Sequence, residues 1–326
     1  MAIKFHRTGK VTFMPQGSSK WEIVCEDVDF KFDISKPFAA VCMDAKISIG
    51  GMSWKNIMAV STWTGEATAF AKNIRIKVCA GYGKDGYENE IFDGTVIYAM
   101  PTTTPPDIWL NVVARSGYYR NNIKFQKFNG NKTASTKNWF ETVAGYINAT
   151  CDFNMDVVGQ ERSLPDFGTG STFEDVKQRI WEEADSLGMV VWERIDNEGN
   201  SVFVFEDKGI VKHPNADFIK KNYTISENTG MIGIPKTNFA EVEVTKFLDT
   251  SFHRGGYFYL DSKYAPKINV IDEETGAMNG IYRINHIRHF GHLRGEAWYT
   301  TFKAWRFYDK DTFDAWHIYQ NPRAGD

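Results

Sequence analysis

A glycine-rich segment, Gly81–Gly86, is the part of this sequence that most resembles a cofactor site. It reads Gly-Tyr-Gly-Lys-Asp-Gly, which has the spacing G-x-G-x-x-G, and it follows the alternating segment Ile74–Cys79. Dinucleotide binding requires a helix to begin at such a segment, because the helix N-terminus meets the pyrophosphate. Here the next residues, Tyr87–Gly94, lead into another strand, so no phosphate-binding helix terminus is expected. We interpret Gly81–Gly86 as a hairpin turn and predict no cofactor.

Three neighbouring histidines, His286, His289 and His292, raise the question of a metal site. Zinc requires several ligands that converge on one point. Because side chains alternate between the faces of a strand, we expect His286 to lie opposite His289, and His292 falls in or near a turn. The spacing favours surface or interface histidines that titrate near neutral pH. We assign no metal ligand, with a zinc site at these histidines as the alternative.

The sequence shows no recognisable nucleophile with a base. It has no Gly-x-Ser-x-Gly elbow and no cysteine in a recognisable catalytic context. Acidic residues are plentiful, and counting does not decide whether two of them form a glycosidase pair. The four cysteines are too sparse for a disulfide scaffold or a zinc site and are interpreted as reduced thiols: Cys25, Cys42, Cys79 and Cys151. We therefore predict no catalytic residue and no enzyme.

The composition favours a β-rich protein that is made and kept in water. Among 326 residues are 24 Phe, 14 Tyr and 10 Trp, and aromatic residues favour pleated, half-buried surfaces. These rings fill β cores, or they form a protein interface or a carbohydrate-binding face. The net charge of −3 argues against a dedicated nucleic-acid binder, which needs a basic field. No apolar run approaches the ~20 residues that span a bilayer, and no signal peptide is recognised.

Short alternating segments separated by turns occupy both ends of the chain, residues 1–120 and residues 211–310. In the first region, Asp93-Gly94 starts an alternating strand, and a return strand begins at Trp109. In the second, Asn279-Gly280 starts such a strand, and a return strand begins at Trp298. Many short strands of this kind are typical of a barrel or sandwich. We predict an internal repeat in which Gly94 and Gly280 let two similar barrels make equivalent turns, so that valine at either position impairs folding or ring formation.

The middle of the chain has a different pattern. After a polar linker, residues 121–135, one helix is predicted to carry Trp139, Phe140, Val143 and Ile147 on one face. A second helix is predicted to begin at the capping box Ser171–Glu174 and to end at Gly188. A hairpin follows, with strands Met189–Ile195 and Ser201–Phe205. Residues 136–210 are thus predicted to form a small α+β domain, and residues 311–326 are left as a C-terminal tail.

Several segments, taken in order, resemble the baseplate hub proteins of contractile phage tails. Asn73–Tyr82 ends in Ala-Gly-Tyr and is followed by Ile91–Val96, which matches the family pattern Ile-Phe-x-Gly-x-Val. Glu227–Pro235, Phe252–Gly256 and Gly280–Gly291 with Trp298 also look like the hub pattern, and the resemblance covers residues 20–305. It marks a set of structural signature positions: Ala80, Gly81, Tyr82, Ile91, Phe92, Gly94, Trp109, Gly230, Gly233, Pro235, Gly255, Gly256, Gly280, His286, Gly291 and Trp298.

The resemblance implies a β-rich α+β fold with two similar tail-tube-like β-barrels flanking the small α+β domain. It also implies a homotrimer whose six similar lobes join a hexameric tail tube, or tube-initiator protein, to a trimeric central spike. The ring would surround the DNA channel, contact other baseplate proteins and DNA in transit, and need no membrane anchor. The expected location is the virion baseplate, after assembly in the host cytoplasm. No spike or lysozyme-like segment is found, so the spike is expected to be a separate protein.

Three alternatives stay open at this point. A carbohydrate-binding or receptor-binding β protein of a tail would explain the Trp and Tyr content. A hub of a bacterial contractile injection system would share the same features. A cell-wall hydrolase would need a carboxylate pair that the sequence does not reveal.

Overall fold

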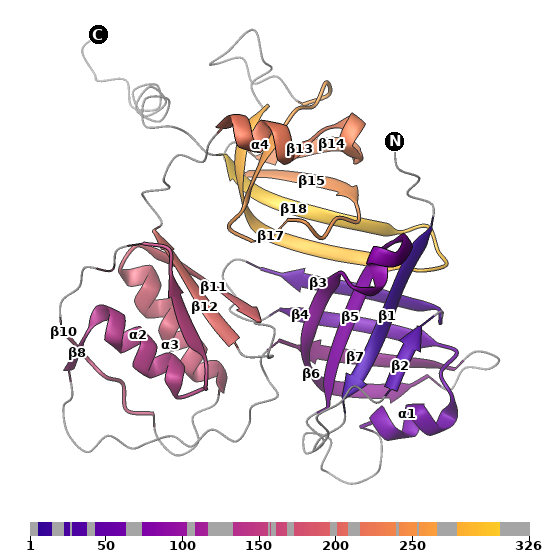
Figure 1. The fold of residues 1–326 in the computed structure, drawn as a ribbon, viewed down its shortest axis with the longest axis horizontal. Helices are drawn as coiled ribbons and strands as arrows, with labels where there is room; N and C mark the ends of the chain where they lie inside the picture. The colour runs from indigo at the N-terminus through magenta and orange to yellow at the C-terminus, as the bar shows by residue number, and fades with distance from the viewer. Residues whose placement is uncertain are drawn as a thin grey trace. The chain divides into compact units, whose positions relative to one another are not determined.

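The computed structural model describes residues 6–14, 23–26, 28–37, 43–62, 74–102, 108–116, 133–155, 157, 161–167, 173–195, 201–207, 216–238, 241–252, 254–265 and 279–306. The chain divides into two compact units. Unit 1 contains residues 1–210 together with 289–298, and unit 2 contains residues 211–288 together with 299–326. Strands predominate in both, and the described residues contain four α-helices (Figure 1). The predicted β-rich α+β class is confirmed.

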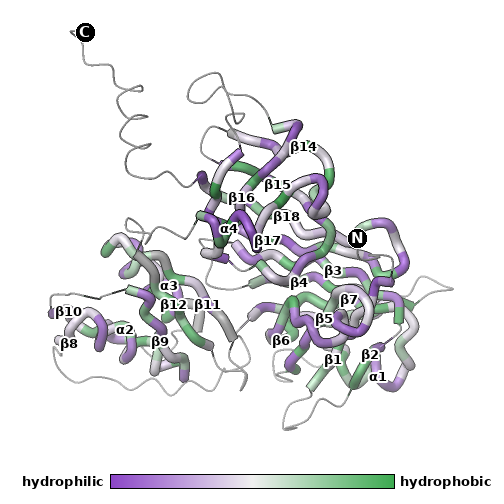
Figure 2. Tube along the Cα trace, turned by 45° about the horizontal axis from the view of Figure 1, so that its top comes forward, coloured by the Kyte–Doolittle hydropathy of each residue, from purple (hydrophilic) through white to green (hydrophobic). Residues whose placement is uncertain are grey.

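The first β region, in unit 1, is an antiparallel sheet. Its strands lie side by side in the order β3-β4-β7-β6-β5-β1-β2. Alternate residues are buried in β7, where Leu110, Val112 and Ala114 face the core, whereas β6 has six consecutive buried residues, 91–96. Figure 2 shows hydrophobic and hydrophilic residues along the trace of these strands. The elements are β1 (Arg7–Met14), β2 (Ile23–Glu26), β3 (Phe30–Lys36), β4 (Asp44–Gly50), α1 (Trp54–Val60), β5 (Arg75–Tyr82), β6 (Glu90–Pro101) and β7 (Trp109–Arg115).

The glycine-rich segment after β5 forms a hairpin connection, as predicted. Gly81 and Tyr82 end β5, and Gly83–Tyr87 form a short 3₁₀ helix, η2, from which the chain enters β6. One turn of 3₁₀ helix between antiparallel strands is not the long helix that a dinucleotide site requires.

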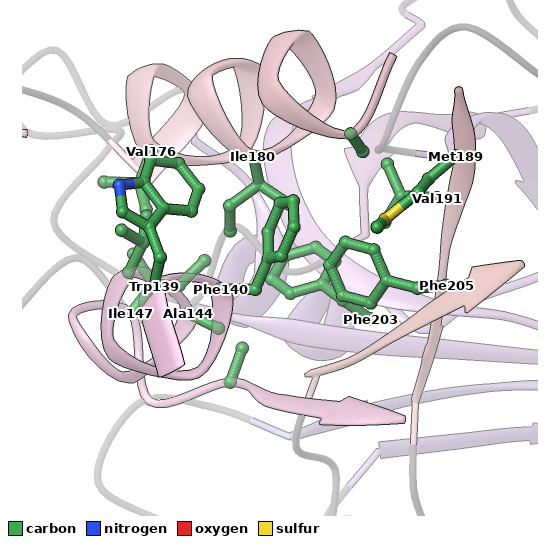
Figure 3. Close-up of a cluster of buried hydrophobic side chains, with 13 residues drawn as sticks. Trp139, Phe140, Ala144, Ile147, Val176, Ile180, Met189, Val191, Phe203 and Phe205 are labelled. Atoms are coloured by element: carbon green, nitrogen blue, oxygen red, sulfur yellow. The ribbon is translucent and has the colours of Figure 1, made fainter. Parts of the chain in front are cut away.

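The segment of unit 1 that is predicted to be a small α+β domain packs two helices against strands. Its main sheet has the order β11-β12-β9, with β12 parallel to β9. The predicted helix faces are confirmed, because Trp139 and Phe140 from α2 and Val176 and Ile180 from α3 meet in one core (Figure 3). The elements are β8 (Thr133–Ser135), α2 (Thr136–Gly145), β9 (Thr150–Phe153), β10 (Glu161–Ser163), α3 (Phe173–Ser186), β11 (Met189–Ile195) and β12 (Ser201–Asp207).

The ends of these elements agree with the sequence in part. Gly188 has φ +69° just after α3, the left-handed conformation predicted for the helix stop. Ser171, the serine of the predicted capping box, lies outside the described residues, as does most of the predicted linker. Its last three residues form β8 and not a loop, because they pair with β10.

Unit 2 holds the second β region, with the strand order β14-β15-β18-β17-β16-β13. Its core gathers rings from several strands, including Phe258, Tyr282 and Phe302. The elements are α4 (Ala216–Asn222), β13 (Thr224–Ile225), the 3₁₀ helix η3 (Glu227–Thr229), β14 (Met231–Asn238), β15 (Glu241–Phe247), β16 (Tyr257–Leu260), β17 (Gly280–His292) and β18 (Trp298–Arg306).

The two β regions share a strand order. Five strands that are consecutive along the chain, β3 to β7, lie in space as β3-β4-β7-β6-β5. Another five, β14 to β18, lie as β14-β15-β18-β17-β16. This correspondence supports the predicted internal repeat, and the closure of each region into a barrel stays a prediction.

The idea that Gly94 and Gly280 make equivalent turns is wrong. Gly94 lies inside β6 and pairs with Ile76 of β5, whereas Gly280 is the first residue of β17 and pairs with Leu260. The strand that was expected to start at Gly94 begins four residues earlier, at Glu90. Turn chemistry therefore does not explain the glycine at position 94.

Candidate assembly site

The signature positions of the first region meet where β5 turns into β6. Ala80 and Gly81 are buried in β5, and Tyr82 ends that strand half-buried. A Cβ atom on Gly81 would lie 2.9 Å from Cα of Gly86, and one on Gly86 would collide with the Thr8 side chain. Thr8 Oγ1 donates a hydrogen bond to the Gly83 carbonyl. Glycine is required here because η2 lies directly against β1 and β5, with no room for a side chain.

The Ile-Phe-Asp-Gly segment of β6 combines a core and a buried ion pair. Ile91 and Phe92 are buried, and a Cβ atom on Gly94 would lie 2.5 Å from the carbonyl oxygen of Arg115. Asp93 is also buried, and its Oδ1 accepts a hydrogen bond of 2.7 Å from Arg75 Nε. Burial raises the pKa of Asp93, and the neighbouring Arg75 guanidinium opposes that rise. The pair links β5 to β6.

The signature positions of unit 2 lie in loops, strand starts and one bulge. Gly230 follows η3, Gly255 and Gly256 precede β16, and Gly280 starts β17. Gly233 and Pro235 lie in β14, in an interruption of its pairing with β15 between Ile232 and Lys236. Gly233 has φ +72°, a conformation that glycine adopts without strain.

The end of the β17–β18 hairpin, residues 289–298, belongs to unit 1. Trp298 is 1% exposed and packs edge-on against Phe30 and Phe32, with ring centroids 6.3 Å and 5.1 Å away. A Cβ atom on Gly291 would lie 2.7 Å from both Phe32 and Trp298. Gly291 lies within β17, and the rings of Phe32 and Trp298, which we call the Trp298 cluster, leave space there only for glycine.

Polar contacts hold the same hairpin end. The Arg7 guanidinium donates hydrogen bonds to the carbonyls of His292, Gly295 and Glu296 and lies 5.7 Å from the Trp298 ring centroid. His292 Nε2 is 2.9 Å from Asp29 Oδ2, and Leu293 N donates to the Phe30 carbonyl. The sequence did not reveal Arg7 or Asp29, because their partners lie more than 260 residues away along the chain.

His286 and His289 lie on opposite faces of β17, as predicted, but the expectation of surface or interface histidines is wrong for His289. His289 is buried and His286, on the opposite face of β17, is half-buried; His292 is the last residue of the strand. Burial lowers the pKa of His286, and the positive charges of Lys303 and Arg288 lower it further. In the described part of the chain, no group of three or more His, Cys, Asp or Glu residues could hold a metal ion.

Trp109, the remaining signature residue, is half-buried at the start of β7. Lys31 Nζ lies 4.5 Å from its ring centroid, and the His292 ring meets it edge-on at 6.3 Å. This ring therefore lies between Lys31 and His292, whereas the Trp298 ring packs against Phe30 and Phe32.

Cysteine thiols of unit 1 and one further ion pair of unit 2 lie wholly or partly in the interior. Burial raises the pKa of Cys25 and Cys79 to about 11 and that of Cys151 to about 12, so these thiols are not nucleophilic thiolates at neutral pH. In unit 2, Lys246 Nζ lies 2.6 Å from Asp249 Oδ2. Burial alone would raise the pKa of Asp249, but Lys246 and the hydrogen bonds from Ser251 hold it below its usual range. The geometry supports structural roles for these groups.

A protein-family model described as baseplate hub gp41 matches residues 10–272. Comparison of the sequence with curated proteins finds no match. None of the helices in the described ranges is long and apolar enough to cross a membrane.

Solved structures with the same fold include two tail proteins. The tail protein from Neisseria meningitidis MC58 has a TM-score of 0.56 and 10% identity, over 93% of this chain and 97% of that one. The 43 kDa tail protein of prophage MuSo2 from Shewanella oneidensis has a TM-score of 0.54 and 12% identity, over 91% and 96%. The E. coli c3393 protein, a type VI secretion component, has a TM-score of 0.52 and 8% identity, over 91% and 77%. At these identities the likeness establishes the fold alone.

Proposed function

Because this chain belongs to the baseplate hub gp41 family, we propose that it is a non-enzymatic structural hub of a phage tail baseplate. The observation that carries this proposal is the strand order shared by β3–β7 and β14–β18. A chain that contains two similar β regions offers two similar surfaces to a partner with repeated subunits.

The proposed assembly is a homotrimer in which two tube-like barrels per chain give six similar lobes. A hexameric tail tube then docks on six quasi-equivalent lobes, and a trimeric spike docks on the three-fold side. Cyclic symmetry lets one patch serve every subunit. The ring surrounds the channel through which DNA passes, and the net charge of −3 suits a wall that does not retain DNA. The partners are the tube or its initiator, the spike and other baseplate proteins.

The buried signature positions support a structural role. Asp93, the acid of the Ile-Phe-Asp-Gly segment, forms an ion pair with Arg75 that links β5 to β6. The glycines beside it allow close backbone packing. We place the protein in the virion baseplate, after assembly in the host cytoplasm.

A second candidate, the hub of a contractile injection system, is favoured by one observation. The fold extends to the type VI secretion component c3393 with a TM-score of 0.52. Both candidates share the trimeric architecture, and the genes that neighbour the coding sequence would separate them.

Mass photometry of the purified chain, alone and with the tube or spike protein, tests the proposal. We expect particles of three chains, and we expect electron microscopy of those particles to show six lobes around a channel. A monomer that binds glycans on an array would instead support the receptor-binding alternative. Clearing of a cell-wall zymogram would support a hydrolase.

A further inference from the structure

The bulge in β14 holds an aliphatic side chain out in solvent. Ile232 pairs with Thr245 and Lys236 pairs with Glu243, so Gly233–Pro235 stand opposite Val244 alone. Within this bulge Pro235 is buried, Gly233 has φ +72°, and Ile234 is 62% exposed. Bulges re-aim a side chain and are conserved features of sheets. The buried proline and the left-handed glycine therefore define a protrusion, which we call the Ile234 knob.

The knob lies on a terminal strand. Among the described strands, β14 pairs only with β15. A proline and a bulge on an edge strand limit the continuation of the backbone ladder. A partner that meets this edge is therefore recognised mainly by side chains.

The strand order of unit 1 also ends in a short strand, β2, which pairs in the described structure only with β1. Val24 of β2 is 49% exposed, and the Glu26 side chain, two residues further on, is 50% exposed. The knob has the same spacing, since the Lys236 side chain, two residues after Ile234, is 81% exposed. Each segment thus presents one aliphatic and one charged side chain, and the two charges are opposite.

We propose that the Ile234 knob of one chain docks on β2 of a second copy of this chain, with Ile234 against Val24 and Lys236 against Glu26. The two segments run parallel in this contact, because only that direction matches both pairs at once. The contact joins two different surfaces, and such heterologous contacts close into a ring when the rotation permits. The inference rests on the proposed trimer and names the surfaces that form it.

Lys236 and Glu26 each form an ion pair within their own chain, and the proposed contact would replace these two pairs. Lys236 Nζ is 3.5 Å from Glu243, and Lys10 Nζ is 4.0 Å from Glu26. Exposed pairs of this kind contribute little to stability, so a docked partner replaces them at small cost. The apolar contact supplies most of the affinity, and the Lys236–Glu26 pair supplies direction.

Disulfide cross-linking tests the geometry. Val24→Cys and Ile234→Cys are combined in one chain, oxidised and run on a non-reducing gel. A closed heterologous ring gives a covalent trimer, whereas each single variant gives none. Cross-linking of the Ile234→Cys variant alone would reveal a symmetric β14–β14 contact and overturn the proposal.

Mass photometry of Ile234→Glu tests the energetics. A carboxylate in this contact is expected to weaken trimer formation about 100-fold. Ile108→Glu is the matched control, since Ile108 is 42% exposed and lies on neither strand. Ile234→Ser removes the apolar side chain without adding charge, and it replaces Ile234→Glu if circular dichroism shows that the latter is unfolded.

Charge reversal tests the second pair. Glu26→Lys and Lys236→Glu should each weaken the trimer about fivefold, and the double reversal should restore it. Lys303→Glu is the control, because Lys303 also pairs with Glu243, at 3.8 Å, but belongs to β18.

The outcomes separate this contact from the trimer itself. If the wild-type chain forms a trimer, the Ile234→Glu or Ile234→Ser variant forms it equally well, and the cysteine pair does not cross-link, then the proposed contact is wrong. The trimeric hub is not contradicted by that result. A wild-type chain that stays monomeric at every concentration, with and without spike protein, contradicts the trimer and the contact together.

Discussion

The two β regions of this chain arrange five strands in the same order, yet their matching residues have different surroundings. Trp109 and Trp298 each begin the last of the five strands. Trp298 is fully buried among phenylalanine rings, whereas Trp109 is half-buried beside Lys31 and His292. The same position in the shared strand order therefore holds a fully buried ring in one region and a half-buried ring in the other.

The glycines differ in the same way. In the first region, Gly81 and Gly94 have ordinary φ values and are needed because neighbouring backbone comes within 3 Å of where a Cβ atom would be. In the second, Gly233 has a positive φ, and a Cβ atom there would meet nothing within 4 Å. Close packing thus selects glycine at positions 81 and 94, and backbone conformation selects it at position 233.

The pairs of Asp93 with Arg75 and of Asp249 with Lys246 show a third difference. Burial leaves the pKa of Asp93 raised despite Arg75. The pKa of Asp249 is lowered, because Lys246 and Ser251 outweigh burial. A shared strand order thus fixes the path of the backbone and leaves the electrostatics of each core to local neighbours.

Replacing the two tryptophans should give the largest difference between the regions. Trp298→Ala removes a buried indole from the Trp298 cluster, and we expect a loss of about 3–5 kcal/mol in the free energy of unfolding. Trp109→Ala removes a half-buried ring and should cost about 1–2 kcal/mol. Urea denaturation measures both values. Equal losses would mean that the two positions are energetically equivalent.

Valine at Gly94 should cost more than valine at Gly280. At position 94 the new Cβ atom meets the Arg115 backbone carbonyl at 2.5 Å, and overpacking of this kind costs about 3 kcal/mol. At position 280 the nearest atoms belong to the Arg306 side chain, 3.6 Å away, and φ is +156°, so we expect about 1 kcal/mol from the backbone. Thermal melting of both variants tests this order, and a greater loss of stability for Gly280→Val than for Gly94→Val would contradict it.

Acidification should affect Asp93 and Asp249 in opposite directions. Because the pKa of folded Asp249 is below its usual value of 3.8, its stabilising contribution is present above that value and is lost as the pH falls toward the folded pKa. Asp249→Asn should therefore flatten the loss of stability below about pH 4.

The pKa of folded Asp93 is above 3.8, so the folded state takes up a proton first and gains relative stability as the pH falls through that window. Asp93→Asn removes this gain and should steepen the acid-induced loss. Denaturant titrations from pH 7 to pH 3 measure both slopes. Parallel curves for the two variants would contradict the opposite shifts.

His286 should give the smallest effect, and only in the second region. Its pKa in the folded state is below the usual 6.5, so the unfolded chain binds the proton more readily and stability falls as the pH drops below 6.5. His286→Gln should flatten the curve between pH 7 and pH 5. In an NMR titration, Lys303→Gln should move the His286 midpoint upward, since Lys303 lowers that pKa; a fixed midpoint would remove Lys303 as a cause.

The sequence by itself determined the β-rich class, the positions of most strands and the two helices of the α+β domain. These depend on local alternation and helical periodicity, as in the stripe of Val176, Ile180 and Ala184 that is buried in the core. It also determined that Gly81–Gly86 joins two strands, because the residues after it alternate as a strand does.

Only the tertiary structure decided why particular residues occupy the signature positions. The glycine at 94 depends on the Arg115 carbonyl, the glycine at 291 depends on Phe32 and Trp298, and the hairpin end is held by Arg7 and Asp29. These neighbours are distant along the chain, and no local pattern encodes which backbone or ring will come within 3 Å of the place where a Cβ atom would be. The periodicity of a strand is a property of one segment. The close approach of a neighbour to a glycine is a property of two segments, so it appears only once the strands are paired.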